Sequence, residues 1–247
     1  MNKEILKHPL LQDNYTIEQA EALQIKWKKN KDEIEKQLDS SKDPEDIRWI
    51  AAVDISFPKI KVPTWGLACA VLWDYQKNEM ITFELVKGDL NFSYVPGFLG
   101  FRENKLIART ILNLPKKPDI LMCDGYGIAH PRKFGEAVHL GVVLMIPSFG
   151  VAKNPFHGYS NWKQLLRKRG ERTPIWEKKP ENIIDSSRDI LGYAICLAND
   201  RKPVFISQGF SISLENAVKI ALDTTFHHRQ PEPLFLADQI SRKELKN

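Results

Sequence analysis

The chain has 247 residues, 43% of them hydrophobic and 27% charged, and its 36 Lys and Arg residues against 31 Asp and Glu give a formal net charge of +5. This composition is ordinary for a soluble globular protein, and the length allows one sizeable core or at most two small ones. No apolar stretch approaches the roughly 18 residues that a transmembrane helix needs, so we expect no membrane span.

The cysteines and the N-terminal segment point to a reducing compartment. Cys69, Cys123 and Cys196 lie far apart, each in an apolar run, and form neither a disulfide set nor a zinc spacing. Residues 1–12 are mixed polar without an apolar core, so we expect no signal peptide and a cytoplasmic protein. The modest basic excess is a weak indication of a polyanionic partner.

Residues 16–38 are predicted to form an outer helix. Thr16 and Gln19 have capping-box spacing, and four apolar side chains share one helical stripe. These are Ile17, Ala20, Leu23 and Trp27. A turn-like stretch from Ser40 to Pro44 follows, so residues 1–45 are interpreted as a helical lead-in to a single domain that spans the chain.

Three strands are predicted next, at residues 49–57, 65–75 and 80–86. The four residues 76–79 suit a hairpin between the second and the third, so the three strands form an antiparallel meander. Asp54 interrupts the apolar run of the first strand, where an acid is rarely placed without a function. A capping carboxylate at the strand end is the alternative.

Residues 91–97 lack regular structure because Pro96 and Gly97 interrupt them. Residues 98–114 are predicted to form a helix that carries Glu103 near its start. Taken alone, Glu103 is explained as well by a solvated acid that the helix dipole favours.

A short apolar run at residues 118–123 predicts a buried strand with Asp124 at its carboxyl end. Ligands collect at that edge of open α/β sheets, and a carboxylate there needs a partner such as a divalent metal. A helix at residues 134–140 and a strand at 142–146 follow, and this alternation predicts parallel pairing.

Residues 154–187 are predicted to be an irregular, basic insertion. A solvated face is the usual explanation of such a cluster of charges, and contact with phosphates is the alternative. The cluster consists of Lys163, Arg167, Lys168, Arg169 and Arg172.

The C-terminal part predicts two strands and two helices. The strands are residues 190–198 and 203–207, the first of the two helices is residues 214–228 with Ser213 as its cap, and the last is residues 234–246. Asp238 lies on this last helix.

Four acids are therefore candidates for one site: Asp54, Glu103, Asp124 and Asp238. If the first and fourth strands lie side by side, the two strand aspartates become neighbours. Hard oxygen ligands suit Mg²⁺ or Mn²⁺, which assist the cleavage of phosphodiesters.

The chain resembles the endonuclease V family, inosine-directed nucleases of the RNase H-like fold, from about residue 49 to residue 241. The matching motifs, in order, are Val53-Asp54-Ile55-Ser56, Tyr94-Val95-Pro96-Gly97 with Phe101-Arg102-Glu103, Asp124-Gly125-Tyr126-Gly127-Ile128-Ala129-His130-Pro131-Arg132, Gly150-Val151-Ala152-Lys153, and Pro231-Glu232-Pro233 with Leu236-Ala237-Asp238. The long central motif is the specific one. The resemblance implies an α/β fold with an RNase H-like mixed sheet, an antiparallel meander plus parallel strands, flanked by helices.

The resemblance also implies roles for single residues. Asp54 and Asp124 match the family's metal-binding aspartates, Glu103 matches its third essential carboxylate, and Asp238 matches a metal position filled by Asp or His. Lys153 matches a lysine near the scissile phosphate, where its charge can offset charge developing in the transition state.

For the substrate, the loop of Tyr94, Val95, Pro96 and Gly97 matches the wedge that enters the duplex. Gly125 and Gly127 match positions that line the pocket for the displaced base. His130 matches a family histidine, either with a direct catalytic part or as a residue that holds its loop by hydrogen bonds.

The function implied is that of a monomeric Mg²⁺-dependent endonuclease, with Mn²⁺ able to substitute, that recognises deoxyinosine in DNA and hydrolyses a phosphodiester bond 3′ to it in DNA repair. It would leave 3′-hydroxyl and 5′-phosphate ends. The alternatives are an endoribonuclease acting on inosine-containing RNA and a nucleic-acid-binding protein without catalytic activity. Ser207-Gln208-Gly209-Phe210 stands where many relatives show Ser-Pro-Gly-His, which leaves the choice of DNA over RNA open.

Overall fold

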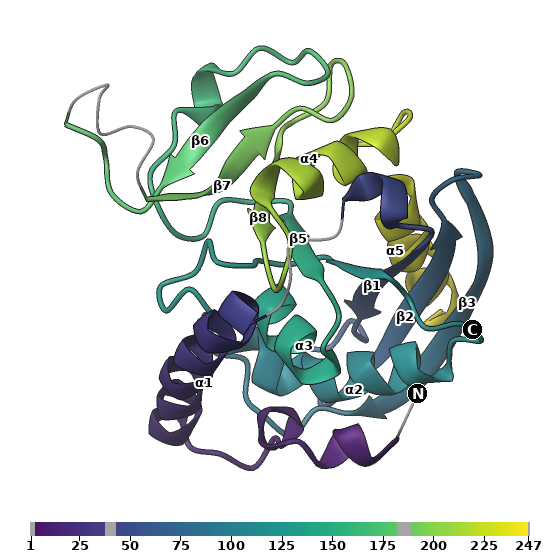
Figure 1. The fold of residues 1–247 in the computed structure, drawn as a ribbon. Helices are drawn as coiled ribbons and strands as arrows, with labels where there is room; N and C mark the ends of the chain where they lie inside the picture. The colour runs from purple at the N-terminus through teal and green to yellow at the C-terminus, as the bar shows by residue number, and fades with distance from the viewer. Residues whose placement is uncertain (1–2, 38–42, 182–188, 247) are drawn as a thin grey trace.

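The computed structural model describes residues 3–37, 43–181 and 189–246, so the predicted helix end at Leu38, the turn at 40–42 and the end of the insertion at Ser187 lie outside the described residues. Over these residues eight strands form one sheet in the order β3-β2-β1-β4-β5-β8-β7-β6 (Figure 1). The strands are β1 (Trp49–Ser56), β2 (Trp65–Asp74), β3 (Glu79–Asp89), β4 (Ile120–Cys123), β5 (Ser148–Ala152), β6 (Arg172–Trp176), β7 (Ile190–Ile195) and β8 (Val204–Gln208).

Helices cover both faces of this sheet (Figure 1). They are α1 (Ile17–Gln37), α2 (Leu99–Asn113), α3 (Glu136–Leu144), α4 (Leu214–Asp223) and α5 (Glu232–Glu244), preceded by the 3₁₀ turns η1 (Lys3–Lys7) and η2 (Pro9–Leu11). None of the helices in the described part of the chain is long and apolar enough to cross a membrane.

The predicted antiparallel meander and parallel pairing are confirmed, and the first and fourth strands do lie side by side. β1 pairs antiparallel with β2 and parallel with β4, and β4 pairs parallel with β5. With β3 antiparallel to β2, the five strands β3-β2-β1-β4-β5 form the expected RNase H-like mixed sheet, in which β2 alone of these five runs in the opposite direction. β8, β7 and β6 extend it by antiparallel pairing.

The sheet has one buried hydrophobic cluster on each face, which explains why the sequences of the central strands are continuous apolar runs. Successive strand residues point to opposite faces, and both faces are buried here. In β1, Ala51 and Val53 pack on the side of α2 and α3, whereas Ile50 and Ala52 pack on the side of α4 and α5. The same alternation directs Asp54 toward the α5 side, as Ser56 confirms by its hydrogen bond to a serine of α5.

One strand prediction is wrong. Residues 142–146 were expected to form the fifth strand, but residues up to Leu144 belong to α3, and the strand is β5, from Ser148 to Ala152. All nine residues of α3 are buried, so the helix has no polar face and its apolar run cannot be told from a buried strand by periodicity. Met145 ends α3 in the left-handed conformation, with φ of 51°.

The irregular reading of residues 154–187 is corrected in part. The described part of this segment contains β6 and a 3₁₀ turn, η4 (Trp162–Gln164), and β6 lies at the edge of the sheet, where Pro174 is tolerated. α4 ends at Asp223, well before the predicted residue 228, and α5 begins at Glu232.

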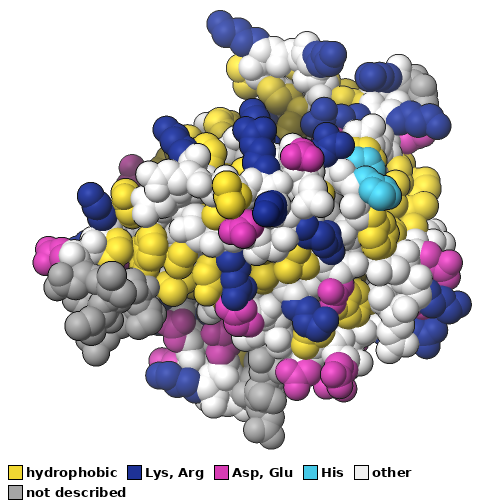
Figure 2. Space-filling view, turned by 90° about the horizontal axis from the view of Figure 1, so that it is seen from above, with side chains coloured by type: hydrophobic (Ala, Val, Ile, Leu, Met, Phe, Trp, Pro, Cys, Tyr) yellow, Lys and Arg dark blue, Asp and Glu magenta, His cyan; other side chains and the backbone are white. Residues whose placement is uncertain are grey.

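Both predicted helix caps are confirmed. Thr16 and Gln19 bond reciprocally at 2.9 and 3.3 Å, and the Ser213 hydroxyl accepts the N–H of Asn216 at 3.1 Å. Figure 2 shows the molecule from above: Lys and Arg side chains are spread over this face, with apolar patches and acidic side chains between them.

Candidate active site

Three of the predicted acids gather at the carboxyl edge of β1 and β4, with a lysine among them. The register pairs Val53 with Cys123, which places Asp54 and Asp124 at the same edge. The Lys153 ammonium lies 2.6 Å from an Asp124 carboxylate oxygen and 3.8 Å from one of Asp238 on α5. The four side chains from β1, β4, β5's end and α5 therefore form one acidic cluster.

The electrostatics of the acidic cluster show an excess of negative charge. Burial, and then the charge of Asp124, hold the pKa of Asp54 well above its usual range, while Lys153 acts in the opposite direction. Burial lowers the pKa of Lys153, but its hydrogen bond to Asp124 and the surrounding acids outweigh burial and raise it. A further cation would therefore be stabilised at this edge.

The donor set of the acidic cluster suits a hard divalent cation, since carboxylate oxygens are the ligands that Mg²⁺ and Mn²⁺ prefer. Within the described ranges, no three His, Cys, Asp or Glu side chains are already arranged to hold a metal ion. Lys153 stands instead between Asp124 and Asp238, and Arg242 bonds Asp238 at 2.8 Å. The three carboxylates can therefore bind a metal ion if the Lys153 ammonium moves away from Asp124 and Asp238.

Glu103 comes from α2, and its carboxyl group interacts electrostatically with Asp54 and Asp124 of the acidic cluster. It is buried, so the reading of Glu103 as a solvated helix-end acid is wrong. Burial, and then the charge of Glu136, raise its pKa well above the usual range, with Asp54 and Asp124 acting in the same direction. Glu103 is thus a buried acid whose charge adds to that of the acidic cluster.

Sequence reasoning missed Glu136, although a signal was present. It is an acid inside the apolar run from Phe134 to Ile146, the same pattern that marked Asp54. Burial, and then the charge of Asp124, raise the pKa of Glu136 to about 8. Its Oε2 atom is buried and has no hydrogen-bond partner among the residues that the structure describes, so it is free to bond to a further group.

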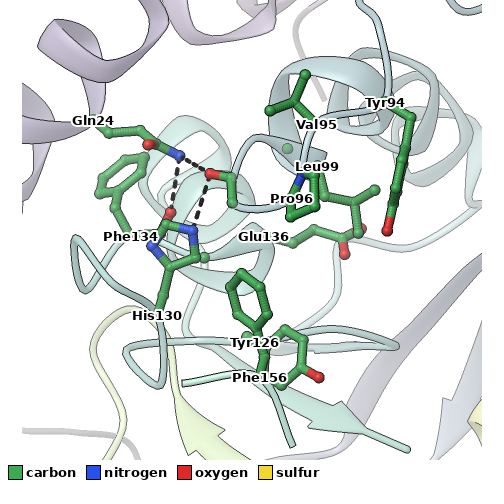
Figure 3. Close-up of a pocket in the computed structure, with 13 residues that line it drawn as sticks. Gln24, Tyr94, Val95, Pro96, Leu99, Tyr126, His130, Phe134, Glu136 and Phe156 are labelled. Atoms are coloured by element: carbon green, nitrogen blue, oxygen red, sulfur yellow. Dashed lines mark hydrogen bonds between the residues drawn. The ribbon is translucent and has the colours of Figure 1, made fainter. Parts of the chain in front are cut away.

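A cavity of about 160 Å³ opens next to the acidic cluster, and we call it the first cavity. Figure 3 shows Glu136 between the loop of Tyr94, Val95 and Pro96 on one side and the ring of Tyr126 on the other. Tyr94 is 70% exposed at its rim. The volume is below that of drug-sized pockets and suits one flat ring system.

The glycines of the central motif do not line the first cavity. Gly127 packs against β8: its N–H donates to the Ser207 hydroxyl at 2.8 Å, and a Cβ there would meet the Gln208 carbonyl oxygen at 2.0 Å. A Cβ on Gly125 would meet Glu136 Oε2 at 2.3 Å. Gly97, at φ +87°, does line the cavity.

His130 is hydrogen-bonded to the loop of Tyr94, Val95, Pro96 and Gly97. Its Nδ1 accepts the N–H of Arg132 at 3.2 Å, so its Nε2 carries the proton and donates to the Gly97 carbonyl at 3.0 Å. The same carbonyl accepts from Gln24 of α1 at 3.0 Å (Figure 3). It also accepts from Arg132 at 2.9 Å. Burial, and then the charge of Arg132, lower the pKa of His130 to about 4, so it is neutral at pH 7.

The residues of the basic cluster in the insertion make different contacts. The guanidinium of Arg169 donates to backbone carbonyls of Leu197, Leu222 and Thr225 at 2.6–2.7 Å, which caps the end of α4. Arg172 pairs with Glu215 at 2.8 Å. Lys163, Arg167 and Lys168 remain exposed.

Comparisons with known proteins agree with this geometry. The family model described as Endonuclease V matches residues 31–239. Endonuclease V of Dictyoglomus turgidum is 34% identical over 229 residues, which cover 90% of this chain and 94% of the relative. The crystal structure of endonuclease V from Streptomyces avermitilis has 32% identity, covers 95% of both chains and superposes with a TM-score of 0.77.

A further solved structure shows a relative with nucleic acid. It is the Ciona intestinalis endonuclease V in complex with a 23mer DNA containing an inosine followed by a ribo-adenosine, with 27% identity, a TM-score of 0.76, and coverage of 94% of this chain and 99% of that chain. The family match spans most of the chain and contains the acidic cluster. The chain therefore belongs to the endonuclease V family of nucleases.

Proposed function

We propose that this protein recognises inosine in DNA and hydrolyses a phosphodiester bond on its 3′ side, as a step in DNA repair. The observation that carries the proposal is the acidic cluster of Asp54, Asp124, Asp238 and Lys153 beside a cavity that has an exposed tyrosine at its rim. The DNA with an inosine bound by the Ciona intestinalis relative supports the choice of substrate.

In this proposal Asp54, Asp124 and Asp238 hold Mg²⁺, or Mn²⁺ in its place, and Glu103 supports the site from the α2 side. The ion supplies Lewis-acid stabilisation of the phosphoryl oxygens. Lys153 exchanges its contact with Asp124 for the scissile phosphate, where a point charge offsets negative charge that grows in the transition state. Cleavage leaves a 3′-hydroxyl and a 5′-phosphate.

The first cavity takes the displaced base, and we call it the base pocket from here on. The exposed ring of Tyr94 and the adjacent Pro96 fill the gap that the base leaves in the stack. Flipping costs least for a mispaired base, which favours a deaminated purine. Glu136 at the pocket wall offers its unpartnered oxygen to the base edge.

A single-turnover nicking assay tests the proposal. The wild-type protein is expected to nick a duplex with one inosine in the presence of Mg²⁺ and to leave the matched adenine duplex intact. Asp124→Asn is expected to slow nicking by roughly a hundredfold or more, the scale on which loss of one charge-stabilising group acts. Asp32→Asn, in an exposed ion pair of α1, is the control and should keep the wild-type rate.

Full activity of the Asp124→Asn protein would overturn the assignment of the site. The same assay with inosine in single-stranded DNA and in RNA decides which nucleic acid is preferred. Nicking of RNA alone would replace the DNA proposal by the endoribonuclease alternative, and binding without product in any metal would favour the non-catalytic one.

A further inference from the structure

A second cavity, of about 390 Å³, lies directly beside the base pocket. Tyr126 and Phe156 line both cavities, and their rings pack against each other with centroids 5.2 Å apart. The two cavities are therefore separated by one aromatic wall. Nothing in the chemistry proposed above uses the second cavity.

Aromatic side chains dominate the second cavity. Besides the shared wall, it is lined by Tyr159, Trp162 and Phe205. The Trp162 and Phe205 rings meet edge to face, at 5.5 Å and 82°. In such a pair each ring keeps at least one face that its partner does not cover, so Trp162 can stack on a further flat group.

The cavity rests on a small core of its own, which makes it a built feature of the fold. Ala129, Ile175 and Phe205 belong to a buried cluster between the loop after β4, β6 and β8. The Ser160 hydroxyl oxygen is buried at the cavity without a hydrogen-bond partner among the described residues. A ligand with both a flat apolar face and polar edges would satisfy both features.

Charge and position favour a segment of nucleic acid. Lys163 lines the cavity, Arg167 and Lys168 follow it on the exposed surface, and no acid stands among the described lining residues. The cavity is also close to the proposed cleavage site, since Pro155, which lines it, follows Lys153 by two residues. The Tyr126 hydroxyl donates to the Asn154 carbonyl between them. A strand that reaches Lys153 therefore passes this opening.

We propose that the second cavity is a subsite for one unpaired nucleobase of the bound nucleic acid, held by stacking on Trp162. The inference rests on the proposed function, because it places this base next to the flipped inosine. Stacking on an aromatic side chain accepts any base, so the subsite adds affinity for unpaired structure and no sequence preference. The base comes either from a nucleotide flanking the inosine or from the position opposite it in the other strand.

The experiment is a thermodynamic cycle between protein and substrate variants. Affinity is measured by fluorescence anisotropy for single-stranded and duplex oligonucleotides with one inosine, each carrying an abasic residue at one flanking or opposing position. Trp162→Ala is expected to weaken binding by about 5- to 150-fold, and Trp162→Phe to restore most of it. At one position the abasic residue should weaken binding to the wild type and have no effect on the Trp162→Ala protein.

The position that shows this coupling identifies the source: a flanking site in both substrates, or the opposing site in the duplex alone. Trp65→Ala is the matched control. A lysine ammonium lies over each ring, that of Lys163 over Trp162 and that of Lys87 over Trp65, but Trp65 is on β2 and does not line the cavity. Ser160→Phe fills the cavity from its wall and should reproduce the loss if the Trp162→Ala protein does not fold.

Equal abasic penalties in wild type and in both cavity variants at every position would overturn the subsite. The failure of the proposed function has a different signature. A wild-type protein that does not nick inosine-containing strands refutes the nuclease proposal. The subsite is tested separately with an inosine-free oligothymidylate, which should bind the Trp162→Ala protein more weakly than the wild type.

Discussion

Glu136 is a buried carboxyl group at the wall of the base pocket, and its raised pKa of about 8 keeps it protonated at pH 7. A protonated carboxyl both donates and accepts hydrogen bonds, as a glutamine amide does. The O6 and N1–H edge of hypoxanthine offers one acceptor and one donor in return. The side chain is therefore matched to a lactam edge in its neutral form.

We predict that Glu136→Ala lowers kcat/KM for inosine-containing DNA by about 5- to 150-fold, the effect of losing a buried hydrogen bond of roughly 1–3 kcal/mol. Glu136→Gln keeps a donor and an acceptor and should remain within a few fold of wild type. Initial rates on single-stranded inosine oligonucleotides measure both. Equal rates for the alanine variant and wild type would exclude contact between Glu136 and the base.

At the same scale, individual residues show what the sequence could reveal of the site. Asp54 and Asp124 were predictable because an acid in or directly after an apolar strand is conspicuous, but that their strands pair in parallel was only a condition of the prediction, which the structure fulfils. The burial of Glu103 could not be foreseen, because it depends on α3 packing over the first turns of α2. The position of Lys153 between two carboxylates likewise requires the fold.

At the scale of elements, a buried histidine joins the N-terminal turns to the helix layer. His139 of α3 donates from Nε2 to the Leu10 carbonyl of η2 at 2.6 Å. Burial lowers the pKa of His139 from 6.5 to about 4, so the folded protein keeps it neutral. Burial outweighs the hydrogen bond to Leu10, which by itself would raise the pKa.

The folded protein should therefore lose stability as the pH falls from 6.5 toward 4. In this window the unfolded chain binds a proton at His139 and the folded chain does not, which lowers the free energy of unfolding by roughly 2 kcal/mol at pH 5. His139→Gln, which cannot titrate, should reduce that loss, measured as urea midpoints at pH 7 and pH 5. His227→Gln, on the exposed surface, should leave it unchanged, and an equal loss in the His139 variant would contradict the assignment.

The α3 and β5 boundaries show the limit of periodicity. Both elements are buried on all sides, so neither has the polar stripe that distinguishes a helix from a strand. By contrast, α1 and α4 were found with their caps because one face of each meets solvent. Sequence patterns therefore locate elements best where the element lies at the surface.

At the scale of the whole molecule, the net charge of +5 is small, and three exposed basic residues lie on one short segment, of which Lys163 lines the second cavity: Lys163, Arg167 and Lys168. Figure 2 shows basic side chains spread over the face seen there. Contacts between such residues and phosphates release counterions, so binding weakens with salt in proportion to their number.

The variant in which these three residues become Gln should bind with a shallower slope of log K against log salt, by about one for each phosphate that it no longer neutralises. The control variant replaces Lys77, Lys116 and Lys117, which also removes three positive charges. These lysines lie at the amino end of β1, opposite the edge that carries the acidic cluster. Lys77 is in the β2–β3 hairpin, which the pairing of Trp49 with Asp74 places at that end, and the Lys116 ammonium lies over the Trp49 ring. Equal slopes in the two variants would show that only the net charge of the protein matters and that these three residues make no specific phosphate contacts.

The Gly97 carbonyl accepts hydrogen bonds from α1, from His130 and from Arg132, and one of these donors lies outside the matched family region, which starts at residue 31. Gln24 therefore ties the amino-terminal helix to the loop of Tyr94, Val95, Pro96 and Gly97. A Gln24→Ala protein would keep every acid that is proposed to bind a metal and would lose one of the three donors to this carbonyl. We expect it to bind inosine-containing DNA more weakly and to hydrolyse the bound DNA at the wild-type rate.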